Sequence, residues 1–148
     1  DCVENNIKKI IQISSSEVYG NVLNLGKKIL RESDVLSAES PYAASKIAAD
    51  HLSLTMYKEH GLPITVARPF NTFGPRQSLR AVIPSIILQC LKNKKNIYLG
   101  DLTTSRDFNY VENITDAFVK TINNKVSIGE VINIGSNYEI KIASITCR

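Results

Sequence analysis

The segment IKKIIQISSSEVYG, residues 7–20, changes within a few positions from a run dense in isoleucine to a polar turn. Residues 7–13 have the pattern of a strand that is buried on both faces, as in a parallel sheet. Residues 14–20 follow this strand, and open parallel sheets bind ligands beyond the carboxyl ends of their strands. The segment therefore predicts an α/β fold with a polar site after its first strand.

A long helix and a second strand complete the first repeat of this pattern. Ser40 and Pro41 predict the helix start, because serine caps a helix and proline fits its first turn. Its expected apolar stripe has three members, Ile47, Leu52 and Met56. Gly61 is expected to end the helix, and residues 64–67 form the next buried strand. Strand, helix and strand in this order imply a right-handed parallel crossover.

The second half of the chain predicts further loops, helices and short strands. Turn-forming residues indicate a loop at 71–77, and apolar spacing indicates a helix over 82–91 with Pro84 in its first turn. Short strands are expected at 97–99 and 131–134. Another amphipathic helix is marked by four apolar residues, Ile114, Ala117, Phe118 and Ile122.

Composition and charge limit the classes of function. The 148 residues are 43% hydrophobic and 22% charged, which is ordinary for a soluble globular protein. The net charge is +4, and the densest basic run is Lys92, Lys94 and Lys95, where a helical pattern ends. A nucleic-acid site needs basic residues gathered on one face, so we expect no nucleic-acid partner. A mild positive field suits an anionic small molecule.

The cysteines and the hydropathy pattern exclude two further classes. Cys2, Cys90 and Cys147 are far apart and odd in number, so we expect neither a metal site nor a disulfide framework. Cys90 lies within an apolar helical pattern and is expected in the core. No apolar run approaches the roughly 18 residues that span a bilayer, so no membrane partner is expected.

Tyr42 and Lys46 are four residues apart on the expected helix and therefore share one face. A tyrosine phenol titrates near 10 and is a poor base at neutral pH, and a nearby ammonium favours its ionised form. Such a phenolate can take a hydroxyl proton while the same carbon loses a hydride to a nicotinamide. The same spacing is also that of an ordinary exposed helix pair.

Three arginines lie in two further segments of the chain, the first of which follows the expected strand 64–67. Arg68 and Arg76 flank residues 69–75, and Arg106 opens the stretch 106–111. Each guanidinium either contacts phosphate through two donors or forms a structural pair with an Asp or Glu. The residues alone leave both interpretations open.

Four ordered segments together resemble the extended short-chain dehydrogenase/reductase family, the NAD-dependent epimerases and dehydratases of nucleotide sugars. The matching motifs are Ser-Ser-x-x-Val-Tyr-Gly from residue 14, Tyr-x-x-x-Lys from 42, Arg-Pro-x-Asn-x-Phe-Gly-Pro from 68 and Arg-Asp-Phe-x-Tyr-Val from 106. The resemblance covers nearly the whole chain. It implies the C-terminal part of a doubly wound Rossmann-type parallel sheet with a small substrate-binding lobe.

The resemblance also assigns domains and roles. Residues 1–75 and 107–135 would belong to the NAD-binding domain, and residues 76–106 and 136–148 to the substrate-binding lobe. The implied catalytic residues are Ser15, which orients the sugar C4 oxygen, Glu17, Tyr42 and Lys46. The implied cofactor-binding residues are Tyr42, Lys46 and Pro69. The implied substrate-binding residues are Ser16, Asn71, Arg76 and Arg106.

Glu17 directs the resemblance towards one reaction. Family 4-epimerases usually lack an acid at this position, whereas dehydratases and sugar-nucleotide decarboxylases have a Glu there. In a 4,6-dehydratase, a hydride leaves C4, Glu17 would remove the C5 proton, water leaves from C6 and the hydride returns to C6. Ser16 stands where thymidine-diphosphate-glucose dehydratases have an Asp that protonates the C6 hydroxyl, which disfavours that substrate.

Residues 68–84 most resemble the N-acetylglucosamine 4,6-dehydratases of legionaminic-acid-type pathways. The expected protein is therefore a lyase that uses NAD and a nucleotide-linked N-acetylglucosamine or related hexose, with the nucleotide left open between guanosine and uridine. The alternatives are a 4-epimerase, a UDP-glucuronate decarboxylase, and an inactive truncated or non-catalytic binding protein. The resemblance implies a cytoplasmic homodimer that pairs partly through the helix with Tyr42.

One family feature is missing from the sequence. The glycine-rich loop that holds the NAD pyrophosphate at a helix N-terminus does not occur, nor does the acidic residue that would hold the adenosine ribose. The sequence begins at Asp1, near the fifth strand of the expected sheet. We therefore expect a fragment that by itself does not hold NAD as the family does, and the choice between NAD and NADP is left open.

Overall fold

The computed structural model describes residues 2, 5–21, 29–92 and 96–146. The chain divides into two compact units, which are described separately. Unit 1 comprises Asp1–Phe70 and Glu112–Ile134, and unit 2 comprises Asn71–Val111 and Gly135–Arg148. Residues 71–75, 107–111 and 135, which were expected in the NAD-binding domain, thus cluster with unit 2.

Unit 1 is built on a parallel sheet. Its strands are β1 (Ile10–Ile13), β2 (Ile64–Pro69) and β5 (Val131–Ile134), in the order β1-β2-β5. Both pairs are parallel, with Ile10 opposite Ile64 and Ala67 opposite Ile132. The expected α/β class and the parallel strand–helix–strand unit are confirmed.

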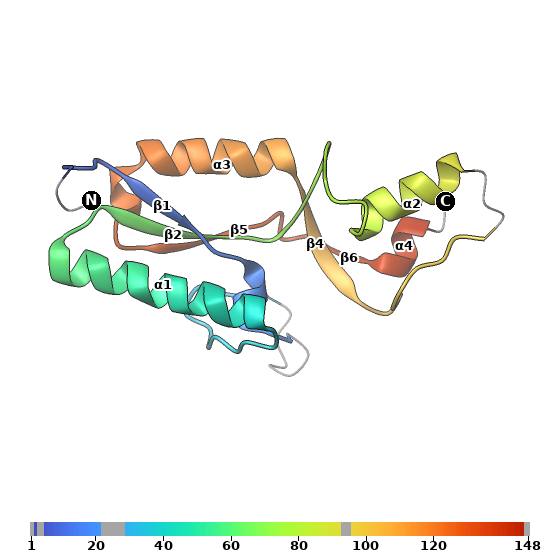
Figure 1. Ribbon diagram of the computed structural model, residues 1–148, viewed down its shortest axis with the longest axis horizontal. Helices are drawn as coiled ribbons and strands as arrows, with labels where there is room; N and C mark the ends of the chain where they lie inside the picture. The colour runs from blue at the N-terminus through green and yellow to red at the C-terminus, as the bar shows by residue number, and fades with distance from the viewer. Residues whose placement is uncertain (1, 3–4, 22–28, 93–95, 147–148) are drawn as a thin grey trace. The chain divides into compact units, whose positions relative to one another are not determined.

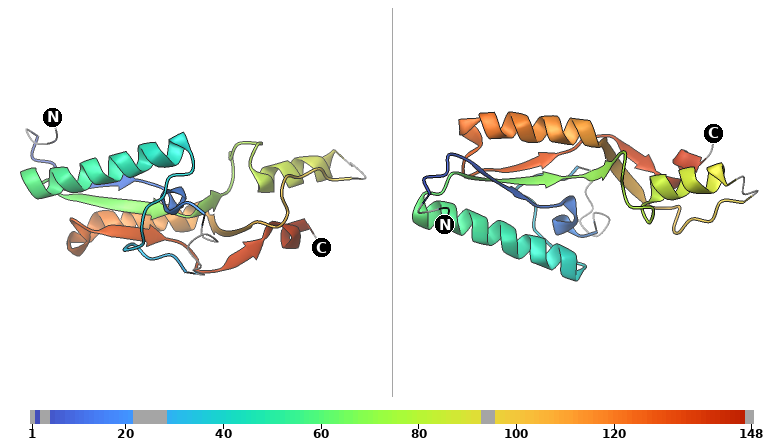
Figure 2. Two further views of the ribbon diagram at one scale, coloured as in Figure 1. Left: turned by 90° about the horizontal axis from the view of Figure 1, so that it is seen from below. Right: turned by 45° about the horizontal axis from the view of Figure 1, so that its top comes forward.

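The helices of unit 1 are α1 (Pro41–His60) and α3 (Val111–Asn123), with two short 3₁₀ helices, η1 (Ser16–Tyr19) and η3 (Lys125–Ser127). α1 and α3 cover opposite faces of the sheet (Figures 1 and 2). As the sequence predicts, the Ser40 hydroxyl caps α1 by accepting from the Ala43 amide at 3.0 Å. Gly61 ends α1 in the left-handed conformation with φ 64°.

The buried face of α1 differs from the expected apolar stripe. Its two fully buried residues are Ala43 and Asp50, whereas Leu52 is 64% exposed. On α3, Ile114 and Thr121 are buried and Ile122 is exposed. Of the expected stripe residues, only Leu52 and Ile122 are exposed, and the others are buried or half-buried. Each helix also buries a polar residue, Asp50 or Thr121, which a search for apolar spacing passes over.

The core of unit 1 lies along β2. Ile64, Val66 and Ala67 are buried there, as expected for a central parallel strand. β1 begins only at Ile10, and Ile13 is 48% exposed, so the prediction of a strand over residues 7–13 buried on both faces is wrong. Among the described residues β1 pairs with β2 alone, which leaves its other edge open.

Unit 2 has a smaller mixed sheet. Its elements are β3 (Asn71–Phe73), α2 (Val82–Leu91), β4 (Ser105–Tyr110), β6 (Glu139–Lys141) and α4 (Ile142–Thr146). β3 pairs with β4 in parallel, and β4 pairs with β6 antiparallel. Residues 71–73 were expected in a loop, but they extend along β4, where Phe73 packs edge-on against Phe108 at 6.4 Å between ring centroids.

The expected strand at residues 97–99 does not form. The Gln89 side-chain amide instead forms the two hydrogen bonds that a neighbouring strand would form. It accepts from the Tyr98 amide and donates to the Tyr98 carbonyl, both at 2.9 Å. α2 forms as predicted with Pro84 in its first turn, yet none of its residues is buried and Cys90 is exposed, contrary to expectation. Lys94, Lys95 and Cys147 lie outside the described residues. Of the helices in the described part, none is both long and apolar enough to cross a membrane.

Candidate functional site

In unit 1, the polar segment after β1 turns sharply into η1. The Ser14 amide still donates to the Ala67 carbonyl at 2.7 Å, which extends the pairing by one residue. Ser15 then caps η1, its hydroxyl accepting from the Glu17 amide at 3.2 Å. Gly20 ends η1 with φ 68°, and a Cβ there would meet the Ser37 carbonyl. This tight turn leaves Ser15 and Ser16 half-buried and the Glu17 side chain exposed.

The predicted Tyr42–Lys46 pair lies in the first half of α1. The Lys46 ammonium is 5.7 Å from the centroid of the Tyr42 ring. It also donates to the carbonyl of Ile13, the last residue of β1, at 2.8 Å. η1 packs against α1 and lies beside the end at which that helix begins (Figures 1 and 2). Unit 1 therefore brings the elements that carry the four predicted catalytic residues next to one another.

A buried network that sequence reasoning missed lies behind this surface. Asp50 and Arg68 are 1% and 3% exposed, and Asp50 Oδ2 accepts from Arg68 Nε at 3.0 Å and from the Ser14 hydroxyl at 2.9 Å. Arg68 Nη1 donates to the Tyr19 hydroxyl at 2.9 Å, which donates to Asn133 Oδ1 at 2.7 Å. Of its two open interpretations, Arg68 therefore takes the structural ion pair.

Two observations describe this network further. Burial raises the pKa of the Tyr19 phenol, and the neighbouring Arg68 partly opposes that shift. The sequence did carry a signal for Asp50, which follows Lys46 by four residues as Lys46 follows Tyr42. Asp50 is buried on the inner face of α1, although it is a charged residue.

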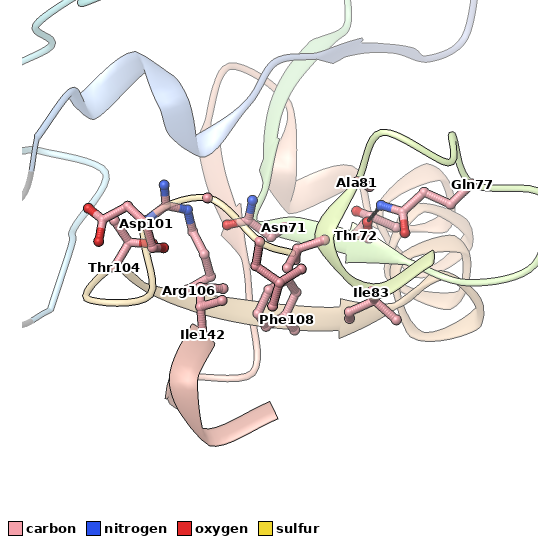
Figure 3. A pocket seen from close by; sticks show the side chains of 13 residues that line it. Asn71, Thr72, Gln77, Ala81, Ile83, Asp101, Thr104, Arg106, Phe108 and Ile142 are labelled. Carbon is pink, nitrogen blue, oxygen red and sulfur yellow. Dashed lines mark hydrogen bonds between the residues drawn. The ribbon is translucent and has the colours of Figure 1, made fainter. Parts of the chain in front are cut away.

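Unit 2 contains a pocket of about 310 Å³. Its polar and aromatic lining comes from Asn71, Thr72, Gln77, Asp101, Thr104, Arg106 and Phe108. Figure 3 shows these side chains, which stand on β3, on β4 and on the segments beside them. The pocket thus brings together two of the predicted substrate-binding residues, Asn71 and Arg106.

The alternation of side chains along β4 explains this arrangement. Arg106 and Phe108 line the pocket, and Asn71 is the register partner of Phe108 on β3. Asp107 points to the other face, where its carboxylate accepts from the backbone amides of Ser136 at 3.2 Å and Asn137 at 3.0 Å. β4 therefore forms the wall of the pocket with one face and anchors a turn with the other.

The pocket carries charges of both signs. Hydrogen bonds from the Thr103 hydroxyl and amide lower the pKa of Asp101, and the Arg106 charge adds to that effect. Arg106 Nη1 donates to the Ser105 carbonyl at 2.7 Å. Asp101 is not among the site residues predicted above, and its only signal in the sequence is the Gly100-Asp101 turn.

The remaining predicted residues are placed as follows. Arg76 is exposed, has the left-handed φ of 67°, and is not part of the pocket lining, so the structure does not group it with Asn71 and Arg106. Pro69 ends β2 opposite Ile134 of β5. Over the ranges that the structure describes, no cluster of His, Cys, Asp or Glu could hold a metal ion.

The doubly wound sheet of unit 1 and the strand-end polar segment define a Rossmann-type α/β protein. Residues 2–135 match the model of the NAD dependent epimerase/dehydratase family, and the chain belongs to that family. The dTDP-D-glucose 4,6-dehydratase of Dictyostelium discoideum is 36% identical over 147 residues, which cover 94% of this chain and 34% of that protein.

Two solved structures extend the comparison. The UDP-N-acetylglucosamine 4-epimerase of Methanobrevibacter ruminantium has a TM-score of 0.87 and 35% identity, covering 98% of this chain and 46% of that one. The dTDP-glucose 4,6-dehydratase of Bacillus anthracis, in complex with NAD, has a TM-score of 0.84 and 34% identity, covering 93% and 43%. The chain thus spans less than half the length of these relatives, among which dehydratases and epimerases both occur.

Proposed function

We propose that the protein containing this chain is a NAD-dependent nucleotide-sugar 4,6-dehydratase that acts on a nucleotide-linked N-acetylglucosamine or a related hexose. The exposed carboxylate of Glu17 carries this proposal. It stands on η1, two residues after Ser15, and η1 packs against the helix with Tyr42 and Lys46. Dehydration across C5 and C6 needs a base beside the groups that oxidise C4, and this arrangement would supply one.

The residues of unit 1 fit the nicotinamide end of the cofactor. A lysine ammonium has three N–H donors, and Lys46 uses one on the Ile13 carbonyl at 2.8 Å, so the others can reach ribose hydroxyls. Among the described residues the Tyr42 hydroxyl has no hydrogen-bond partner, which leaves it available to a substrate. A bound nicotinamide would supply the acceptor and donor of hydride. The sequence has no glycine-rich loop, so this fit concerns the nicotinamide end alone.

The side chains of unit 1 would divide the proton transfers between them. The Ser15 hydroxyl orients the C4 oxygen, and the Tyr42 oxygen takes the C4 hydroxyl proton, with the Lys46 charge nearby to stabilise the resulting anion. A ketone at C4 acidifies the C5 proton, which Glu17 removes. Glu17 then holds the proton with which the C6 hydroxyl departs as water, so Ser16 need not be an acid. Hydride return to C6 is accompanied by return of one proton to C5, which balances the proton that Tyr42 took from the C4 hydroxyl.

The pocket of unit 2, considered by itself, has the size and the polar groups to bind a nucleoside diphosphate. Its volume of about 310 Å³ is within the range of small-molecule sites. The Arg106 guanidinium presents several donors to phosphate oxygens, and the Asn71 amide adds both a donor and an acceptor. This role for Asn71 and Arg106 is part of the proposal, and Arg76 is left out of it because it does not line the pocket.

A 4-epimerase is the second candidate. The likeness to the Methanobrevibacter ruminantium UDP-N-acetylglucosamine 4-epimerase, at 35% identity, favours it. Epimerisation at C4 needs the Ser15, Tyr42 and Lys46 groups but no base for C5, so Glu17 distinguishes the two candidates.

The test uses the complete protein that contains this chain, incubated with NAD and separately with UDP- and GDP-linked N-acetylglucosamine. We expect a 4-keto-6-deoxy sugar by NMR of the product. Glu17→Gln keeps the shape of the side chain but not its basicity, so dehydration should fall by about 10²- to 10⁴-fold. Appearance of the C4 epimer, at a rate that Glu17→Gln leaves unchanged, would establish the epimerase instead. Tyr42→Phe is the matched control, because it should abolish either reaction.

A further inference from the structure

We propose that the buried Asp50–Arg68 pair is the positioning element of the active-site segment in unit 1. It holds both ends of residues 14–19, hereafter the 14–19 segment, and fixes them to α1. Its catalytic consequence rests on the proposed function, whereas its structural consequence does not.

The first anchor lies at the start of the 14–19 segment. Asp50 Oδ2 accepts from the Ser14 hydroxyl at 2.9 Å. One helical turn earlier on α1, the Lys46 ammonium donates to the Ile13 carbonyl at 2.8 Å. Two successive turns of α1 therefore bind two successive residues of the chain, and Ser15 comes immediately after them. The distance between the Ser15 hydroxyl and the face of α1 with Tyr42 is thereby fixed.

The second anchor lies at the end of the same segment. Arg68 Nη1 donates to the Tyr19 hydroxyl at 2.9 Å, and the guanidinium carbon is 5.1 Å from the centroid of the Tyr19 ring. Tyr19 is fully buried, and its hydroxyl donates onward to Asn133 of β5. Glu17 lies between the two anchors, so its backbone has little freedom while its carboxylate stays exposed.

One guanidinium connects these two anchors. Arg68 Nε binds Asp50 at 3.0 Å while Arg68 Nη1 binds Tyr19, so a planar fork spans both contacts. Arg68 is 3% exposed and cannot contact a phosphate from that position. The pair therefore acts through Ser15 and Glu17 and is not itself in contact with a substrate. Preorganisation of this kind matters because misplacement of reacting groups by about 1 Å can cost about 10²-fold in rate.

The test removes one anchor at a time from the complete protein. Ser14→Ala deletes the hydroxyl that reaches Asp50, and Tyr19→Phe deletes the hydroxyl that reaches Arg68. The matched control is Thr65→Val on β2, which also deletes a fully buried hydroxyl. The Thr65 hydroxyl donates to the Ser127 carbonyl at 2.5 Å and makes no hydrogen bond to the 14–19 segment. Ser14→Ala removes one buried hydrogen bond, whereas Tyr19→Phe and Thr65→Val each remove two, so Thr65→Val reproduces at least the general loss of stability of either anchor variant.

The first readout is amide hydrogen exchange without substrate or cofactor. The amides of Glu17, Val18 and Gly20 are all hydrogen-bonded within η1. We expect them to exchange at least about tenfold faster in Ser14→Ala and Tyr19→Phe but at the parent rate in Thr65→Val, since only the first two free the segment. Unchanged exchange in both anchor variants, or an equal increase in the control, overturns the proposal.

The second readout is the separation of kcat from KM. We expect kcat to fall about 10- to 100-fold in the anchor variants, with KM within about twofold, because the proton-transfer groups and not the nucleotide pocket are displaced. Thr65→Val should keep the parent kcat. Faster exchange with an unchanged kcat would refute the catalytic consequence. An inactive parent protein would instead refute the proposed function, while the exchange result would still decide the positioning role.

Discussion

The two units place their charged residues in opposite surroundings. In unit 1, Asp50 and Arg68 are 1% and 3% exposed and bind each other and two buried hydroxyls, while Asp50 Oδ1 has no hydrogen-bond partner among the described residues. In unit 2, Arg106 and Asp101 line the pocket and are exposed. Arg106 donates to the carbonyl of the preceding residue, Ser105, and Asp101 accepts from the amide of Thr103, two residues later. The charged pair of unit 1 is therefore shielded from water, whereas the charges of unit 2 are solvated and accessible to the ligand that the proposed function assigns to the pocket.

The difference has an energetic cause. A buried ion whose partner is removed remains without compensation, and this costs about 3–5 kcal/mol, whereas an exposed ion is compensated by water. The same residue type, arginine, should therefore serve stability in unit 1 and binding in unit 2. Three predictions test this contrast, beginning with the largest expected effect.

Replacing each arginine by methionine should separate the two units by stability. Arg68→Met leaves Asp50 buried without its partner and should lower the free energy of unfolding by about 3–5 kcal/mol. Arg106→Met changes an exposed side chain and should cost less than about 0.5 kcal/mol. Denaturant unfolding of the complete protein measures both, and similar losses for the two variants would contradict the contrast.

The binding of nucleoside diphosphate should show the reverse order. A charge-assisted hydrogen bond is worth about 1.5–3 kcal/mol, so Arg106→Met should weaken UDP or GDP binding by about 10- to 100-fold. Arg76→Met is the control, because Arg76 is exposed outside the pocket lining and its loss should leave affinity nearly unchanged. Titration calorimetry decides this, and an equal loss in the Arg76 variant would remove the pocket from the proposed function.

The smallest expected effect is a pH dependence confined to unit 1. Burial raises the pKa of Tyr19 above its ordinary value of 10.0. The unfolded phenol therefore loses its proton at a lower pH than the folded one, and stability should fall as the pH rises above that ordinary value. Tyr19→Phe should show a shallower decline, whereas Tyr98→Phe in unit 2, which changes an exposed tyrosine, should keep the parent slope. Thermal unfolding across alkaline pH measures this decline.

The sequence predicted those features that depend on local chemistry. Ser40 and Gly61 act as the expected ends of α1, and Pro84 lies in the first turn of α2. The α/β class with a parallel sheet is confirmed as well. Capping and turn formation require only neighbouring residues, so a single sequence reveals them.

Features that depend on distant partners were not predictable. β3 was expected as a loop because its strand character comes from pairing with β4, more than thirty residues away. Residues 97–99 were expected as a strand, but the side chain of Gln89 binds the backbone amide and carbonyl of Tyr98 instead. Likewise Arg68 could be assigned to an ion pair only once the fold had brought Asp50 to it. The roles of Ser15, Glu17, Tyr42 and Lys46 stay predictions.

Because β4 lines the pocket with one face and binds the turn at residues 136–137 with the other, its length should be restricted during evolution. Residues 96–104 precede the strand, and insertions in exposed connections are usually tolerated. Within β4, however, one inserted or deleted residue would turn Arg106 and Phe108 away from the pocket and turn Asp107 towards it. We therefore expect homologous sequences to keep the spacing from Ser105 to Tyr110, and to vary in length before Leu99, where the pocket lining of this segment begins.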